Sequence, residues 1–257
     1  MMIHTIIQQM GSTQSLEQFM NSKIFQPPKR DLKNLDHLAA PNVKIDGTNT
    51  NSGYVYFMIT LPHTGSVTKY IVFSHGTGDD IVSNYDFCKH LANQLNVGVV
   101  IYDYPGYGCS TGQPTEQGCY DSLNNVMFHL TKVLKIDKSN IILMGYSLGT
   151  GVVVDYTMRH EWNKTIVLCA PYKSIISVQH DNILTRPIDK FVTVSKIGKL
   201  KCPVKIFHGE ADTVINVSHS KELFELVVNK QFKPTYLPGI GHELMGKISL
   251  DEIKDIL

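Results

Sequence analysis

The sequence has no excess of charge of either sign, because its 257 residues carry a formal net charge of only +1. It has neither a basic field that could attract nucleic acid nor an acidic tail, so we set nucleic-acid binding aside. No apolar run approaches the roughly 20 residues that a membrane-spanning helix needs. The first ten residues, MMIHTIIQQM, lack the basic segment of a secretory signal peptide. We therefore expect a soluble chain with no transmembrane segment.

Cysteine pairs and metal-binding patterns are also missing. The five cysteines form an odd set without a C-x-x-C pair, which is more typical of free thiols in a reducing compartment than of a disulfide framework. No group of His and Cys residues has the spacing of a zinc site, and H-E-x-x-H does not occur. We therefore expect a cytoplasmic protein with no metal and no cofactor.

Two weak membrane signals lie near the N-terminus. Apolar residues recur at helical spacing between Ile3 and Met10, but the first basic residue is Lys23, so a membrane-surface helix would lack its usual cationic face. Residues 10–15 spell M-G-x-x-x-S, a myristoylation pattern that is internal in this numbering. We expect this segment to pack on its own domain, and peripheral membrane contact stays open.

From about residue 43, short runs rich in Val, Ile, Tyr and Phe alternate with longer helical patterns. Such runs are typical of interior strands of a largely parallel sheet, and the alternation predicts a three-layer α/β fold with helices on both faces of the sheet. We expect strands in YVYFMIT, YIVFSH, VGVVIYDY, NIILMG, TIVLCA, VKIFHG and KPTYLPG, and helices at about 82–95, 114–135, 148–160, 216–229 and 246–257.

The expected domain organisation is simple. Residues 1–42 form a lead-in that is irregular over 26–42, and residues 43–257 form one α/β domain. A short insertion at about 173–201 interrupts the alternation of strands and helices. Because ligands of open α/β sheets bind outside the carboxyl ends of the strands, this insertion is expected to form a small cap over the site.

The pattern G-x-S-x-G, which places a catalytic serine on a sharp turn between a strand and a helix, occurs twice. Ser147 lies in GYSLG, directly after the strand run IILM and directly before a helical pattern. Ser110 lies in GCSTG, but the strand before it has already ended at Pro105, and further loop residues follow. Because the turn forces strained backbone between two adjoining elements, Ser147 is the predicted nucleophile.

A serine nucleophile needs a histidine base and an acid that orients this base, in the chain order serine, acid, histidine. Asp212 lies just beyond the strand VKIFHG and is preferred over Glu210, the spare candidate. His242, in GIGHELMG between the last strand and the final helix, is the predicted base. Most other histidines are expected to be surface or core residues, while His75 and His208, each before a glycine at a strand end, are expected to pin loops.

The reaction also needs hydrogen-bond donors for the developing oxyanion, normally the backbone N–H after the nucleophile and another after the third strand. The N–H of Leu148 takes the first position. The stretch SHGTGDD follows the strand run YIVF, and glycines on both sides of Thr77 allow a tight turn. The N–H of Thr77 is therefore the expected second donor.

Together, the stretches SHGTGDD, YDYPGYGCSTGQPTE, GYSLGTG, HGEADTVI and GIGH resemble the α/β-hydrolase superfamily. From about Phe25 onward, the middle stretches and FQPPKR more closely resemble the subfamily that includes eukaryotic protein depalmitoylases. The resemblance implies the α/β-hydrolase fold, with Ser147 as nucleophile, Asp212 as acid and His242 as base.

The resemblance also implies that Ser110 and Asp103 belong to a structural loop beneath the site. The chain differs from the depalmitoylase subfamily at two places. The residue after the HG pair is typically Asn in that subfamily and is Thr77 here. The depalmitoylases carry a cysteine-rich, lipid-anchored N-terminus, whereas this sequence has no cysteine before Cys88.

These observations predict a serine hydrolase that cleaves a carboxylic ester or a thioester through an acyl-enzyme intermediate. Acyl-protein thioesters come first among the expected substrates, which makes a lipidated protein an expected partner. A lipase-like esterase and a serine peptidase are alternatives within the same chemistry. A catalytically silent α/β-hydrolase scaffold that binds a partner or a small ligand is the alternative from another class.

Overall fold

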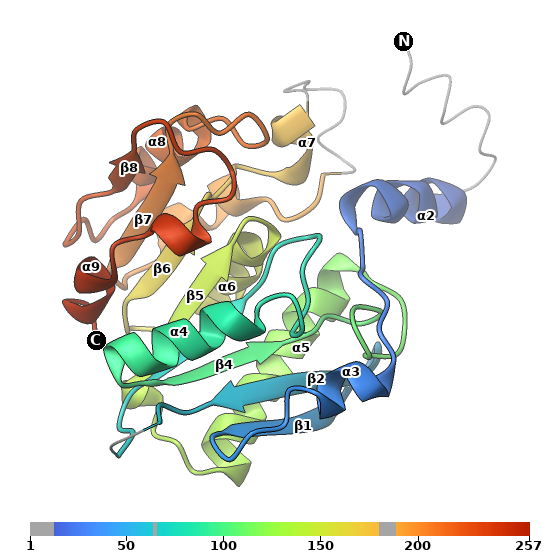
Figure 1. Cartoon of the computed structure of the whole chain (residues 1–257). Coiled ribbons are helices and arrows are strands. Elements are labelled where there is room, and N and C mark those ends of the chain that lie inside the picture. Colours follow the sequence, from blue (N-terminus) through green and yellow to red (C-terminus); the bar gives the residue numbers. More distant parts are fainter. Residues whose placement is uncertain (1–12, 64–65, 180–188) are drawn as a thin grey trace.

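The computed structural model describes residues 13–63, 66–179 and 189–257 (Figure 1). The apolar residues between Ile3 and Met10, the start of the M-G-x-x-x-S pattern and residues 180–188 of the expected cap lie outside these ranges. Within them, no helix combines the length and the apolar character that crossing a membrane requires. The division of the chain at residue 42 and the bounds of the cap stay predictions.

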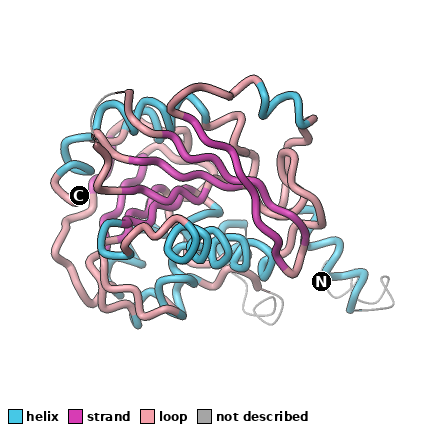
Figure 2. Tube along the Cα trace, turned by 90° about the horizontal axis from the view of Figure 1, so that it is seen from below, coloured by secondary structure: helices cyan, strands magenta, loops and turns pink. Residues whose placement is uncertain are grey.

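One mixed sheet of eight strands forms the centre of the described part, with the strand order β1-β2-β4-β3-β5-β6-β7-β8 (Figures 1 and 2). Neighbouring strands from β4 across to β8 are parallel, whereas β2 is antiparallel to both β1 and β4. Parallel strands end at the same edge of the sheet, so the loops after β3, β5, β7 and β8 meet there. The strands are β1 (Val43–Thr50), β2 (Gly53–Thr60), β3 (Tyr70–Ser74), β4 (Gly98–Tyr102), β5 (Ile141–Tyr146), β6 (Ile166–Cys169), β7 (Val204–Gly209) and β8 (Thr235–Leu237).

The sheet is buried on both faces, because alternate side chains of its strands enter two separate cores. In β3, Val72 packs into one core, while Ile71 and Phe73 pack into the other. Helices α5, α6 and α8 contribute to the first core, and α4 and α9 contribute to the second. This arrangement confirms the predicted three-layer α/β fold. The α-helices are α2 (Thr13–Ile24), α3 (Leu32–Asp36), α4 (Tyr85–Leu95), α5 (Glu116–Phe128), α6 (Leu148–Arg159), α7 (Ile175–Gln179), α8 (Ser218–Leu226) and α9 (Leu250–Lys254).

The sheet is largely parallel, as predicted, and differs from the sequence interpretation at two strands. The sequence interpretation contains no strand over 43–50, yet β1 lies there at the edge of the sheet, and its polar sequence VKIDGTNT suits a strand that is only partly buried. The run YVYFMIT forms β2, which is antiparallel rather than parallel to its neighbours. Val55, Phe57 and Met58 are nevertheless fully buried. Burial on both faces therefore gives an antiparallel strand the apolar composition that is typical of a parallel one.

The predicted helices differ from the structure at three places. The supposedly irregular residues 26–42 contain α3. The predicted helix over 114–135 is α-helical only to Phe128 and continues as a π-helical turn over His129–Val133. The predicted C-terminal helix divides into a 3₁₀ turn (Met245–Lys247) and α9, because the Ser249 side chain accepts a hydrogen bond from the N–H of Glu252 and caps a new helix start.

Candidate active site

Ser147 lies on a sharp turn between β5 and α6, with backbone angles φ 49° and ψ −119°. A positive φ is strained for a residue with a side chain, and such strain is found at functional sites. The flanking glycines are required by contact distances. A Cβ at Gly149 would lie 2.0 Å from the carbonyl oxygen of Ser74, and one at Gly145 would lie 2.5 Å from the carbonyl oxygen of Gly149. The G-x-S-x-G pattern at this position therefore serves close packing of strand, turn and helix.

The structure brings Ser147, His242 and Asp212 together in one hydrogen-bonded line. His242 Nε2 lies 3.1 Å from Ser147 Oγ, and His242 Nδ1 lies 2.8 Å from Asp212 Oδ2. A carboxylate only accepts hydrogen bonds, so Nδ1 carries the proton and Nε2 is left to accept one from the serine hydroxyl. Tyr146 donates its hydroxyl to the carbonyl oxygen of His242 at 3.1 Å and holds the His242 loop beside the turn.

Asp212 is the most heavily hydrogen-bonded member of this line. Its Oδ1 accepts the N–H groups of Val214 and Ile215, both at 2.8 Å. Its Oδ2 faces a second imidazole, because His208 Nε2 lies 3.3 Å away. Burial alone would raise the pKa of Asp212, but hydrogen bonds from His208, His242 and the N–H of Ile215 outweigh burial and hold this pKa well below its ordinary value. Asp212 is therefore a carboxylate at every pH at which His242 could act as a base.

His208 shows what sequence reasoning captured and what it missed. Its Nε2 lies 2.8 Å from the carbonyl oxygen of Ile215, so it pins the loop after β7, as its position before a glycine predicts. The same Nε2–H also reaches the Asp212 carboxylate. The only sequence signal for this contact was the spacing of four residues between His208 and Asp212. That spacing brings the two side chains together only because the turn after β7 folds the chain back.

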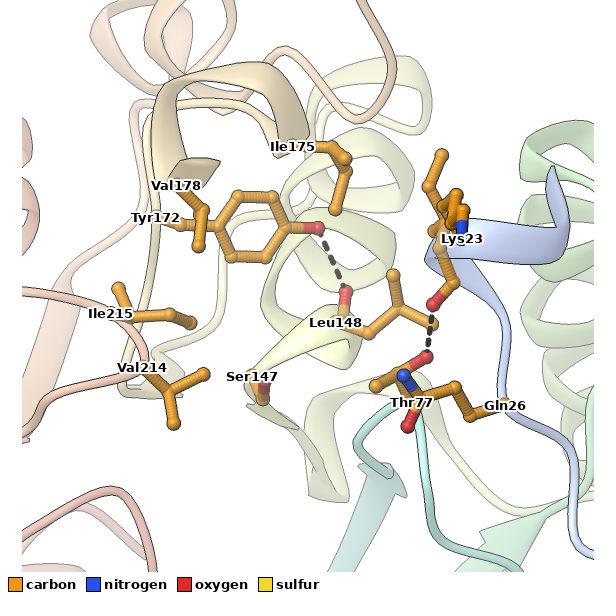
Figure 3. A pocket seen from close by; sticks show the side chains of 11 residues that line it. Lys23, Gln26, Thr77, Ser147, Leu148, Tyr172, Ile175, Val178, Val214 and Ile215 are labelled. Carbon is orange, nitrogen blue, oxygen red and sulfur yellow. Dashed lines mark hydrogen bonds between the residues drawn. The ribbon is translucent and has the colours of Figure 1, made fainter. Parts of the chain in front are cut away.

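The two predicted oxyanion donors lie next to the serine. Leu148 is the first residue of α6, and Thr77 lies in the loop after β3, which runs beside β5. Within the described ranges, no acceptor is bonded to the backbone N–H of either residue. Both residues line the same cavity as Ser147 (Figure 3). Their N–H groups are therefore free to receive an oxyanion.

A cavity of about 190 Å³ opens beside Ser147, and most of its wall is apolar (Figure 3). The apolar residues come from α2, α6, the segment after β6, α7 and the loop after Asp212, while two polar side chains, Lys23 and Gln26, come from α2 and the segment that follows it. No carboxylate belongs to the described lining. The lining residues are Lys23, Ile24, Gln26, Thr77, Ser147, Leu148, Tyr172, Ile175, Val178, Val214 and Ile215.

The discarded candidates lie elsewhere. Ser110 lies in the loop after β4, where its hydroxyl accepts a hydrogen bond from the N–H of Tyr56 at 3.0 Å. Glu210, the spare acid, is exposed to solvent. His75 is fully buried, with Nδ1 2.8 Å from the carbonyl oxygen of Gly76, which agrees with its expected loop-pinning role. Ser110 and His75 therefore have structural contacts away from the Ser147 hydroxyl, and Glu210 faces solvent.

Asp103, which belongs with Ser110 to the loop after β4, is a buried acid. Its Oδ1 accepts the N–H of Ile81 at 2.9 Å, and no hydrogen-bond partner for Oδ2 exists in the described part of the chain. Burial raises the pKa of Asp103 to about 8, and burial lowers the pKa of His75, whose Nε2 lies 4.0 Å from Asp103 Oδ1. The two groups therefore form a neutral pair at pH 7 rather than an ion pair.

Asp103→Asn is expected to change how stability depends on pH. Because the folded state holds the Asp103 proton up to about pH 8 while the unfolded chain releases it near pH 4, this residue lowers the free energy of unfolding as pH rises through that window. Asparagine keeps the acceptor for Ile81 and has no proton to lose. The free energy of unfolding of the variant should therefore rise relative to that of wild type between about pH 4 and pH 8, by at most about 5 kcal/mol. Urea unfolding of both proteins across this window measures the gain, and a difference independent of pH would contradict the buried, protonated state.

Comparisons with known proteins show the family to which the chain belongs. The sequence model of the family described as serine aminopeptidase, S33 (Hydrolase_4) matches residues 65–193. Protein L404 of Acanthamoeba polyphaga mimivirus, which carries an α/β-hydrolase name, is 46% identical over 191 residues, covering 74% of this chain and 73% of the viral protein. The chain belongs to the α/β-hydrolase family. This finding confirms the family that the sequence motifs resemble.

Other relatives of this α/β hydrolase include the human α/β-hydrolase domain-containing protein 17B, which is 34% identical over 73% of this chain and 65% of the human protein. The Caenorhabditis elegans protein aho-3 is 35% identical over 67% of this chain. The chain thus spans about two thirds of the human relative and about half of the nematode one. Among solved structures, an α/β hydrolase from Vibrio vulnificus superposes with a TM-score of 0.75 at 20% identity, covering 94% of both chains. That likeness shows the fold.

Proposed function

We propose that this α/β hydrolase cleaves carboxylic esters or thioesters through a covalent acyl-serine intermediate. The observation that carries the proposal is the line from Ser147 Oγ to His242 Nε2 to the Asp212 carboxylate, with separations of 3.1 and 2.8 Å, beside an apolar cavity. A serine hydroxyl is a weak nucleophile until an oriented base accepts its proton, and this geometry supplies both the base and its orientation.

In the proposed reaction, Ser147 Oγ forms a bond to the acyl carbon while its proton moves to His242 Nε2. The negative charge that develops on the acyl oxygen is stabilised by the N–H groups of Thr77 and Leu148. The Asp212 carboxylate stabilises the imidazolium and does not itself take the proton. Collapse of the tetrahedral intermediate breaks the bond to the leaving oxygen or sulfur, which receives the proton from His242. A water then repeats the sequence on the acyl-serine and releases the acid.

The cavity supports an apolar acyl group as the part of the substrate that is bound. A cavity of about 150 Å³ can hold benzene, so one of about 190 Å³ suits an acyl segment of roughly six to eight carbons. The described lining offers a lysine but no carboxylate to pair with the amino group of a peptide, which favours an ester or thioester over an aminopeptidase substrate. Following the depalmitoylase resemblance, acyl-protein thioesters come first. The five free cysteines support a reducing compartment such as the cytoplasm.

Steady-state and burst kinetics on p-nitrophenyl acetate, butanoate and octanoate, and on the matching acyl thioesters, test this function. We expect a burst of product equal to the enzyme concentration, an acyl adduct on the Ser147 peptide by mass spectrometry, and a lower KM for octanoate than for acetate. Absence of turnover and of adduct with every substrate would instead support the silent binding scaffold.

The same substrates test the acyl cavity through two variants of α7. Val178 lines the cavity, whereas Ile176, on the same helix and also partly buried, does not. Val178→Asn should raise the KM for octanoate about tenfold, because burial of an apolar chain against a valine contributes roughly 1.5 kcal/mol, and should leave acetate unchanged. Ile176→Asn should keep the wild-type preference. An equal effect of both variants would place the acyl chain elsewhere.

A further inference from the structure

The N-terminal segment from Lys23 to Arg30, here called the strap, reaches the loop that holds one predicted oxyanion donor. The Thr77 hydroxyl donates a hydrogen bond of 2.5 Å to the carbonyl oxygen of Ile24 (Figure 3). A hydroxyl carries a single hydrogen, so this contact occupies the only donor of the Thr77 side chain. The side chain is therefore committed to the strap, while the backbone N–H of the same residue has no acceptor in the part of the chain that the structure describes.

The inner end of the strap is packed into the body of the protein. Ile24 and Phe25 are only 7% and 4% exposed. The ring of Phe25 also contacts that of Phe191, with the ring centres 6.2 Å apart. The carbonyl oxygen that Thr77 uses is therefore presented from a buried, well-packed position rather than from a loose terminus.

The outer end of the strap is tied to the loop after β4. The N–H of Gly108 donates to the carbonyl oxygen of Pro28 at 2.8 Å, and the N–H of Arg30 donates back to the carbonyl oxygen of Gly108 at 3.1 Å. Lys29 adds a bond of 2.6 Å from Nζ to the carbonyl oxygen of Gly106. Arg30 in addition pairs with Asp80 at 2.8 Å. The strap is thus fixed at Ile24 and Phe25 and again at residues 28–30.

The loop around Thr77 is held on the Gly76 side and open on the Gly78 side. Gly76 donates its N–H to Asp79 Oδ2 at 3.1 Å, but no atom lies within 4 Å of the position that a Cβ would take at Gly78. Within the described ranges, the only other polar contact of the Thr77 side chain is with the hydroxyl of Tyr107, at 3.5 Å. The carbonyl of Gly76, which shares a peptide plane with the N–H of Thr77, is held by His75 Nδ1 at 2.8 Å and by the N–H of Asp79 at 3.3 Å. On the other side of this peptide plane, next to a glycine that allows many backbone angles, the bond from the Thr77 side chain to Ile24 is the further restraint.

We propose that Thr77 has a second part in the reaction, as a positioning residue whose hydroxyl bond to Ile24 aims its backbone N–H at the oxyanion. The inference rests on the proposed function and adds the strap to the active site. Ile24 also lines the acyl cavity, so one strap residue contacts both the acyl group and the oxyanion loop. The side chain of Thr77, which follows the HG pair, thus acts on the reaction through its hydrogen bond to Ile24 rather than through a bond to the substrate.

Thr77→Val and Thr77→Ser test the inference. Valine keeps the shape of threonine and removes the hydroxyl, whereas serine keeps the hydroxyl. We expect Thr77→Val to lower kcat for p-nitrophenyl octanoate about tenfold at nearly unchanged KM. The reason is that the misdirected N–H of residue 77 no longer donates its hydrogen bond to the oxyanion in the transition state. Thr77→Ser should stay within about twofold of wild type, because the hydrogen bond is retained. The pH profile of kcat should keep its shape in both variants, since His242 is not touched.

Hydrogen exchange of the peptide containing residues 24–30 gives a readout that does not depend on turnover. It should be faster in Thr77→Val than in Thr77→Ser or wild type. Should the valine variant fail to fold, Thr77→Ala takes its place with the same expected loss. Wild-type kcat in Thr77→Val, or equal losses in Val and Ser, would overturn the positioning role while leaving the hydrolase intact. An inactive wild type would overturn the proposed function, and the positioning role with it.

Discussion

Ser147→Ala is expected to abolish covalent labelling by a fluorophosphonate probe and to lower kcat for ester hydrolysis by roughly 10⁴- to 10⁶-fold. The physical reason is the absence of another nucleophile in hydrogen-bond contact with His242 Nε2 in the described part of the chain. The residual rate would come from substrate binding and the oxyanion donors alone. Gel fluorescence and mass spectrometry of the labelled peptide measure the first effect, and p-nitrophenyl octanoate measures the second.

Ser110→Ala is the matched control for this variant, because Ser110 lies in the second G-x-S-x-G of the same chain. Its hydroxyl accepts the N–H of Tyr56, so its removal should cost about 1 kcal/mol of stability and leave labelling intact. Labelling that disappears with Ser110→Ala alone would show that the nucleophile lies on the other turn. Labelling that survives in both variants would point to a third serine.

The serine, acid and histidine could be predicted because each depends on local features of the chain. Ser147 is marked by a strand, a glycine-flanked turn and a helix within about a dozen residues. Asp212 and His242 each follow a strand, and parallel strands bring their carboxyl ends to one edge of the sheet. Chain order and strand ends therefore suffice to place these three residues near one another, although they are 65 and 30 residues apart in sequence.

The cavity wall and the strap could not be predicted in the same way. The contact of Thr77 with Ile24 joins residues 53 positions apart, and Ile24 lies in a segment that the sequence pattern assigns to a lead-in. Nothing in local composition marks a carbonyl oxygen as the partner of a distant hydroxyl. Edge strand β1 was missed for a related reason. It is partly exposed at the edge of the sheet, so its sequence VKIDGTNT is polar and lacks the alternation of apolar and polar residues that predicts a strand.

Asp212→Asn is expected to lower kcat by about 10⁴-fold while the protein stays folded. The asparagine oxygen can still accept the N–H groups of Val214 and Ile215, as Asp212 Oδ1 does now. Its NH₂ group then faces His242 Nδ1 and can only donate to it. His242 is forced to carry its proton on Nε2, where it can no longer accept the proton of Ser147.

Because of His208, the Asp212→Asn variant should also lose stability. The Nε2–H of His208 now points at the Asp212 carboxylate from 3.3 Å and would face an NH₂ group in the variant, so two donors would meet in a fully buried position. The cost should appear as a lower melting temperature in addition to the lower kcat. Glu210→Gln removes the same charge from an exposed side chain two residues earlier. It should stay within about twofold of wild type, because the ring of His242 bonds Asp212 and Ser147 rather than Glu210 among the described residues. Similar losses in both variants would mean that charge near the site, rather than the orientation of the imidazole, sets the rate.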